Sequence, residues 1–194
     1  MTKNKWSWMF GIILFAVTIG LYWQTRNFDY INYDDRVYIH RNGVVTNGLT
    51  VASIRWAFSA EPCRQTSNWH PITTLSWMLD ITLFGDNAGA MHLHNACIHA
   101  IDAVLVFIFL LIVCRLVWPD KQESDKKIRV DATTPRQSGD SYLLFLFAAF
   151  IGAAFWAWHP LRAESVAWVS SRKDVLSILF LLPGLMAYLK RLQG

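Results

Sequence analysis

Four apolar runs without a charged residue dominate the pattern of hydrophobic and polar positions along the chain. They lie at 6–23, 103–114, 142–158 and 175–188. A helix that spans a membrane needs roughly 20 mostly apolar residues, and about 17 can suffice. The second run reaches this length if it begins near His92, and the fourth if it begins before Arg172. We therefore expect an all-α polytopic membrane protein with about four transmembrane helices, at 6–24, 92–117, 142–158 and 168–190.

The first run is expected to remain in the protein as a span, although Lys3 and Lys5 precede it as in a signal peptide. It is longer than the roughly 7–15 residues of a signal core, and no small-x-small cleavage site follows it. Trp and Tyr residues lie at both of its ends, as in the aromatic belts of membrane proteins.

The outer loop 25–91 is predicted to contain short helices. Thr50 can cap a helix from Val51 to about Ser59, and a second helix is expected from Pro71 until Gly85 ends it. Both are too short to span a bilayer, so we expect them to lie at the membrane surface as amphipathic helices do. The alternative is a separate small soluble domain.

The uneven distribution of lysine predicts the orientation. Of the 194 residues, 54% are hydrophobic, and the net charge is +4. Lysines gather near both termini and in the inner loop 118–141, whereas the opposite side holds Lys173 alone. Because positively charged loops stay in the cytoplasm, we expect both termini there, in a multi-pass protein of a bacterial inner membrane. The basic residues alternate with acids, so no nucleic-acid partner is predicted.

The outer loop carries two adjacent acids, Asp34 and Asp35, in the sequence NYDDRVYI. A carboxylate near the low dielectric of a bilayer can act as a general base near neutral pH. The pair could also bind a divalent cation, but two carboxylates are too few for a dedicated site, so no metal or cofactor is firmly predicted. The alternative is a pair of solvated turn acids.

Polar residues recur along the predicted second span. His92, Asn95, His99 and Asp102 are spaced by three, four and three residues, so they form one stripe on a helix. Ionisable residues within a membrane face the protein interior and mark functional sites. We expect this intramembrane stripe to make interhelical hydrogen bonds rather than to bind a metal, because His92 and His94 point to different faces.

Candidates for binding a phosphate or another part of a substrate occur in both outer loops: Arg172, His70, Glu164 and His159. Arg172 lies where the fourth span enters the bilayer, and its guanidinium can donate to a phosphate in a bidentate manner. Its alternative role is an interfacial anchor whose charged head extends toward water. His70 precedes a helix-starting proline, which fixes its direction, so it could donate to a phosphate or to a sugar hydroxyl. The alternative is a histidine that packs against Trp69.

Several stretches together resemble a known family, and they occur in the order NYDDRVYI, LTVASIRWAF, NWHPIT, LDITLFG, HLHNACIH and HPLRAESVAWVSSRKDVLS. They are similar to the N-terminal membrane part of the transmembrane and tetratricopeptide-repeat-containing proteins, most of all to the bacterial branch. The eukaryotic branch includes O-mannosyltransferases that use dolichyl-phosphate mannose, within the C class of membrane glycosyltransferases. Members have further spans followed by the repeats. The resemblance therefore implies that residues 1–194 form one membrane domain, a partial bundle of the glycosyltransferase C type in a truncated member.

The resemblance also implies a function. Asp34 or Asp35 would take the proton of an acceptor hydroxyl, which attacks the sugar as the lipid phosphate leaves, with Arg172 and His70 near the phosphate. The expected activity, in the full-length protein, moves a sugar from a polyprenyl-phosphate-linked donor to a protein hydroxyl or another acceptor, such as a glycan, on the outer face. Two alternatives remain open. One is a non-catalytic membrane anchor for a tetratricopeptide-repeat scaffold, and the other is a transporter-like bundle in which His99 and Asp102 handle protons.

Overall fold

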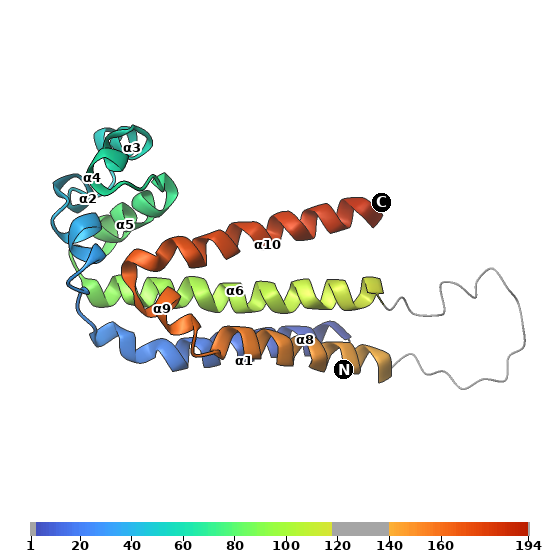
Figure 1. Cartoon of the computed structure of the whole chain (residues 1–194). Coiled ribbons are helices and arrows are strands. Elements are labelled where there is room, and N and C mark those ends of the chain that lie inside the picture. The colour runs from blue at the N-terminus through green and yellow to red at the C-terminus, as the bar shows by residue number, and fades with distance from the viewer. Residues whose placement is uncertain (1–2, 118–139, 194) are drawn as a thin grey trace, which may run out of the picture.

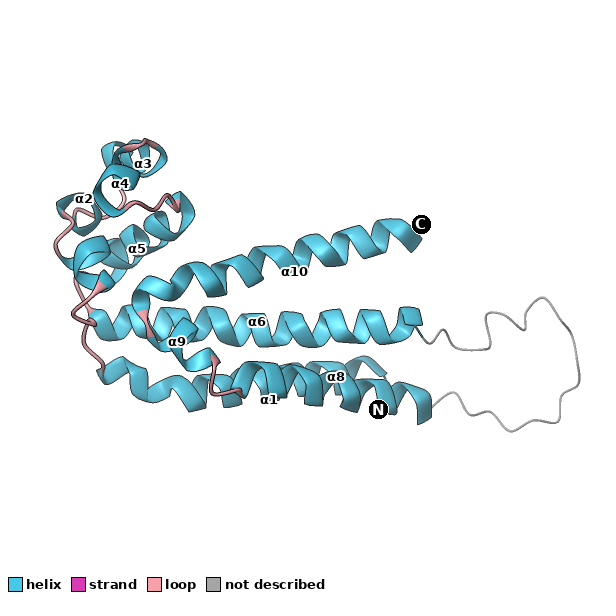
Figure 2. Ribbon diagram, in the orientation of Figure 1, coloured by secondary structure: helices cyan, strands magenta, loops and turns pink. Residues whose placement is uncertain are grey.

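The chain folds into a bundle of long helices with a group of short helices at one end (Figure 1). The computed structural model describes residues 3–117 and 140–193, so most of the expected inner loop 118–141 lies outside the described residues. Within those residues every regular element is helical and there is no strand, as the colouring of Figure 2 shows. The long helices are α1 (Lys3–Tyr22), α6 (Ala88–Val117), α8 (Asp140–Trp158) and α10 (Arg172–Gln193).

Three helical segments are long and apolar enough to cross a membrane: Lys5–Asn27, Ala88–Val117 and Val169–Leu192. They confirm the prediction of a membrane protein. The apolar part of α8, Tyr142–Trp158, is shorter than these three, so the expected count of four spans remains a prediction. The start of α1 and the end of α10 lie at the same end of the bundle (Figure 1).

The longest helix, α6, packs against each of the other three. Phe10 and Leu14 of α1 meet Phe107 of α6 and the small residues Ala149 and Ala153 of α8 in a buried cluster. Small side chains let two helices approach closely where no hydrophobic effect drives them together, as within a lipid bilayer. α10 contacts α6 near its own start and leans away from it toward the C-terminus (Figure 1).

The short helices form the opposite end, which we call the loop end. They comprise η1 (Trp23–Asn27), η2 (Arg36–His40), α2 (Gly43–Thr46), α3 (Val51–Phe58), α4 (Glu61–Thr66) and α5 (Pro71–Phe84). The two predicted helices of the outer loop are confirmed: Thr50 accepts a hydrogen bond from the Ser53 N–H and Ser53 reciprocates, while Gly85 ends α5 with a φ of 69°. This positive φ suits glycine, which has no Cβ. The position of these helices at a membrane surface remains a prediction.

A second buried cluster attaches the loop end to the bundle. Ile39, Trp77 and Met78 pack with Met91 of α6 and with Val169 of the turn η4 (Val169–Ser171), which follows α9 (Arg162–Ala167). The indole N–H of Trp77 donates to the Val169 carbonyl at 3.3 Å. The outer loop and the α9–α10 connection therefore form one packed unit.

Candidate functional site

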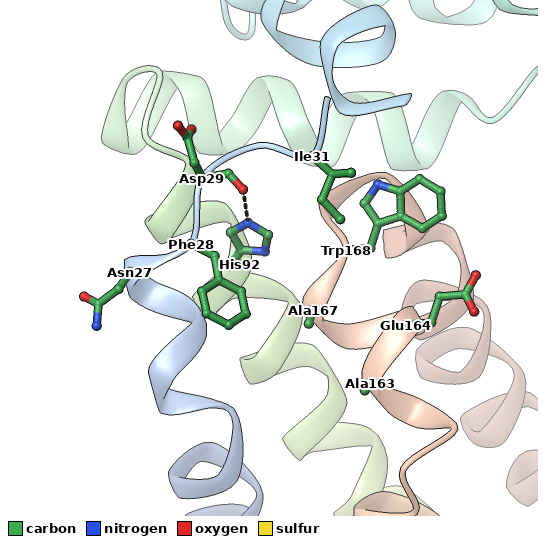
Figure 3. Close-up of a pocket in the computed structure, with 9 residues that line it drawn as sticks. All are labelled: Asn27, Phe28, Asp29, Ile31, His92, Ala163, Glu164, Ala167 and Trp168. Atoms are coloured by element: carbon green, nitrogen blue, oxygen red, sulfur yellow. Dashed lines mark hydrogen bonds between the residues drawn. The ribbon is translucent and has the colours of Figure 1, made fainter. Parts of the chain in front are cut away.

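An open cleft of about 560 Å³ lies at the loop end, between the end of η1 with the residues that follow it, α6 and α9 (Figure 3). Three segments of the chain contribute its walls, and its lining residues are Asn27, Phe28, Asp29, Ile31, His92, Ala163, Glu164, Ala167 and Trp168. Most of this surface is apolar. Ligand pockets commonly combine apolar walls with a few placed polar groups, so the cleft is the candidate functional site.

His92 lies centrally among the residues that line the cleft, and it is fully buried. Its Nε2 lies 3.2 Å from the carbonyl oxygen of Asp29, and since a carbonyl only accepts, Nε2 carries the hydrogen. The Phe28 ring stands edge-on to the imidazole with centroids 5.9 Å apart. These contacts hold the residues after η1 against α6 and shape the inner wall.

Two carboxylates mark the rim of the cleft. In Figure 3 the side chains of Asp29 and Glu164 extend away from His92 on opposite sides of the cleft, and both residues are exposed. Asp29 accepts a hydrogen bond from the Tyr30 N–H at 2.8 Å. The rim is therefore acidic, whereas the interior walls are apolar.

The wall at Trp168 is fixed by two polar residues from distant parts of the chain. Asn95 of α6 donates to the Trp168 carbonyl at 3.0 Å. Asp35 accepts hydrogen bonds from the N–H of Ser170, at 2.9 Å, and from its hydroxyl group. Its second oxygen accepts from the Ile31 N–H at 3.0 Å. Asp35 thus joins the outer loop to the α9–α10 turn.

The two adjacent acids occupy different environments. Asp35 is fully buried, and both of its oxygens have protein donors. Asp34 is partly exposed, and within the described residues no hydrogen bond or ion pair involves its side chain. Neither acid lines the cleft. Asp34 is therefore the acid of the pair whose oxygens have no hydrogen-bond donor among the described residues.

Arg172 is buried at the start of α10, and all three of its guanidinium nitrogens have protein partners. Nη1 lies 2.6 Å from a carboxylate oxygen of Asp80 on α5 and also donates to the Ser76 carbonyl. Nε donates to the Asn95 side chain at 2.6 Å, and Nη2 donates to the Met91 carbonyl at 2.9 Å. The other oxygen of Asp80 bonds to His94 at 2.5 Å. Four of the five guanidinium N–H groups have a partner in this network, which joins α5, α6 and α10, and the side chain is fully buried. The expected phosphate contact of Arg172 therefore remains a prediction.

His70 and His159 lie outside the cleft. The His70 ring packs against Tyr38 and Trp77, with centroids 5.2 and 5.4 Å away, and its Nδ1 lies 3.4 Å from the Thr74 hydroxyl. Burial lowers the pKa of His70, and the positive charge of Lys173 lowers this pKa further. His159 accepts from the Leu161 N–H in the turn between α8 and α9.

All four residues of the polar stripe on α6 are buried. His92 and Asn95 bond as described above, and His99 Nε2 donates to the Ala157 carbonyl of α8 at 2.9 Å. Asp102 differs, because neither of its carboxylate oxygens has a hydrogen-bond partner within residues 3–117 and 140–193. The expected interhelical partner of Asp102 is therefore missing, and no hydrogen bond joins it to His99.

In the described part of the chain, no three His, Cys, Asp or Glu side chains lie close enough together to hold a metal ion. At the acidic pair, the oxygens of Asp35 already accept three protein hydrogen bonds.

Several residues of the site were not singled out by sequence reasoning. Asp29 and Phe28 line the cleft, Asp80 and His94 complete the Arg172 network, and Ser170 binds Asp35. A weak signal existed for Asp80, a lone acid within the otherwise uncharged helix of residues 71–84. No local signal distinguishes Ser170 from Ser171, since only the folded chain brings one of them to Asp35.

The chain is similar to the protein O-mannosyl-transferase Tmtc1 of Drosophila melanogaster, with 25% identity over 177 residues. The match covers 89% of this chain and 17% of that relative, so the chain spans a small part of the relative's length. No family model matches the chain, and no solved structure matches it. The similarity supports a distant relation to O-mannosyltransferases.

Proposed function

We propose that this chain is part of a membrane glycosyltransferase that moves a sugar from a polyprenyl-phosphate-linked donor to a hydroxyl group of a protein or glycan acceptor. The proposal rests mainly on the similarity to an O-mannosyl-transferase across 89% of the chain. The helices that can cross a membrane and the cleft at the loop end agree with it. The apolar cleft walls suit the lipid part of such a donor, and the loop end is taken as the outer face. Asp34, Lys173 and His70 do not line the cleft, so the proposal places the sugar and the phosphate of the donor beyond its rim.

In the proposed reaction Asp34 is the general base. The acceptor oxygen forms a bond to the anomeric carbon of the sugar while the bond from that carbon to the phosphate oxygen breaks. Polyprenyl phosphate leaves with the electron pair, and the hydroxyl proton passes to Asp34. Asp34 is chosen because its oxygens are free, whereas those of Asp35 are occupied. Asp35 is then a positioning residue that fixes the wall at Trp168 through Ser170.

The negative charge of the leaving phosphate requires a cation nearby. Arg172 is enclosed by its network, so we assign this contact to Lys173, the next residue of α10, which is exposed. The positive charge of Lys173 also lowers the pKa of His70. His70 is accordingly proposed as a second donor to the phosphate. Arg172 would position Lys173 and His70 indirectly, because it holds the start of α10 against α5 and α6.

The test is transfer of radiolabelled mannose from a polyprenyl-phosphate donor into protein, in membranes that contain the natural full-length protein. Asp34→Asn should reduce transfer by about 10²–10⁴-fold, the usual contribution of a positioned general base. Glu61→Gln on α4 is the matched control, because in the described part of the chain the Glu61 carboxylate is paired with the neighbouring Arg64 alone. If Asp34→Asn transfers mannose at the unmodified rate, Asp34 is not the base. If no sugar is transferred by the unmodified protein, a non-catalytic anchor replaces the enzyme.

A further inference from the structure

We propose that Asp102 is a proton-binding site in the middle of α6, reached from the aqueous surface through one ordered water molecule in the cavity beside it. This proposal does not rest on the glycosyltransferase assignment. It starts from a single anomaly, a fully buried carboxylate whose two oxygens have no partner in the described part of the chain. Buried polar groups nearly always have partners, so this exception calls for a ligand.

The space beside Asp102 has the size of a water site. A cavity of about 10 Å³, measured as room for the centre of a water molecule, lies between α6, α8, α9 and α10. That volume holds about one water molecule, which needs two to four polar partners. The lining offers such partners, because it includes Asp102, Arg162, Ser165 and Asp174.

The chemistry of the lining favours a proton carried by water over a metal cation. Arg162 lines the same cavity, and its positive charge would repel a cation. It also stacks over the Trp156 ring at 4.7 Å and makes no ion pair with an acid among the described residues. An ionised carboxylate without a donor is costly in an apolar interior. Asp102 avoids this cost by taking a proton from hydronium and leaving water in the cavity.

A hydrogen-bonded route leads from the cavity to the surface. The hydroxyl of Ser165 on α9 donates to the carboxylate of Asp174 on α10 at 3.2 Å, and Asp174 is exposed. Both residues line the cavity that Asp102 faces. A single water molecule placed there would connect the buried acid to this pair, and through it to solvent.

The other polar and titratable groups around Asp102 do not take the place of this water molecule as its hydrogen-bond partner. His99, on the same helix, donates to the Ala157 carbonyl and contacts Tyr22 of α1 edge-on. α8 contributes the neutral Trp156 to the lining, α9 contributes Arg162, and α10 contributes Asp174. None of them makes a hydrogen bond to Asp102.

The experiment is infrared spectroscopy of the complete purified protein in lipid bilayers, as a difference between the wild type and Asp102→Asn. We expect a carbonyl stretch of a protonated carboxylic acid that disappears in the variant and that shifts after transfer to D₂O. Ser165→Ala should slow this shift several-fold. Ser177→Ala is the matched control, since its hydroxyl bonds to the Asp174 backbone and does not line the cavity.

Three results would overturn the proposal: the absence of a protonated-acid band, a band that never shifts in D₂O, or equal exchange rates in Ser165→Ala and Ser177→Ala. A second measurement covers the case in which Asp102→Asn fails to fold. A hydrophobic carbodiimide reacts with protonated carboxyl groups in apolar surroundings, so it should label Asp102 in the wild-type protein. Mass spectrometry of the labelled peptides that finds Asp102 unmodified would also refute the site.

Discussion

The carboxylate of Asp35 accepts hydrogen bonds from both the backbone N–H and the hydroxyl of Ser170, a residue 135 positions later in the chain. Both residues are buried, Asp35 completely. The contact fixes the α9–α10 turn against the outer loop, directly beside the Trp168 wall of the cleft. One of the two adjacent acids is thereby committed to structure, and the other is the one that we propose as the general base.

Replacing Asp35 should destabilise the protein far more than replacing its neighbour. Asp35→Ala leaves the donors of Ser170 and Ile31 without a partner, and each unsatisfied buried group costs about 1–3 kcal/mol. We expect a loss of about 3 kcal/mol in the free energy of unfolding, measured by chemical unfolding in detergent. Asp34→Ala, at a partly exposed position, should change it by less than about 0.5 kcal/mol. Equal losses in the two variants would contradict the assigned roles.

The Arg172–Asp80 pair should behave as a coupled unit. Arg172→Met leaves Asp80 as a buried charge without its cation, and breaking such a pair typically costs about 3–5 kcal/mol. Adding Asp80→Leu removes that charge, so the double variant should recover a large part of the lost stability. Unfolding measurements on both single variants and the double variant form the cycle that tests this. A double variant less stable than Arg172→Met would show that the pair is not the source of the loss.

Gly89 permits the close approach of α6 to η1. A Cβ at this position would collide with the backbone carbonyl of Arg26, which cannot move aside as a flexible side chain could. Gly89→Ala should therefore cost about 1–3 kcal/mol, the usual penalty of overpacking, seen as a lower unfolding temperature in detergent. Gly20→Ala on α1 serves as the control, because nothing lies within 4 Å of a Cβ there. An unchanged unfolding temperature in Gly89→Ala would refute this packing.

Stability should fall in mildly acidic solution through His70. Its folded pKa lies below the ordinary value of 6.5 because of burial and Lys173, so the unfolded chain binds the proton first. Neutral His70 makes its full contribution to the free energy of unfolding above pH 6.5, and this contribution is lost as the pH falls toward the pKa of His70 in the folded protein. His70→Asn should lack this part of the pH dependence in unfolding experiments between pH 7 and pH 5. Identical pH profiles for the two proteins would show that His70 titrates normally.

The orientation in the membrane can be tested with the natural cysteines. Cys63 is exposed on α4 at the loop end, whereas Cys97 and Cys114 lie within the apolar helix α6. A membrane-impermeant thiol reagent applied to intact cells should label the wild type and fail to label Cys63→Ser. Labelling of Cys63 only after the cells are opened would place the loop end in the cytoplasm and reverse the proposed orientation.

Much of the local structure could be predicted because it depends on neighbouring residues. Apolar runs identify the long helices, and the caps at Thr50, Pro71 and Gly85 define α3 and α5 within one or two residues. Helical spacing also placed His92, Asn95, His99 and Asp102 on one stripe, and all four are buried. Each of these inferences uses contacts between residues close in the sequence.

The sequence by itself determined where the helices lie and which polar residues enter the bundle, since helix periodicity and capping are local. It could not assign their roles. Asp34 and Asp35 are chemically identical neighbours, and only the arrival of Ser170 from the far end of the chain separates a buried anchor from a free carboxylate. Likewise, only the packing of α5 against α6 and α10 brings Asp80 to Arg172. Only the packing of α6 with α8, α9 and α10 places Asp102 beside its cavity, without a hydrogen-bond partner among the described residues. The tertiary structure decided these roles, because a charged group's environment is set by residues distant in sequence.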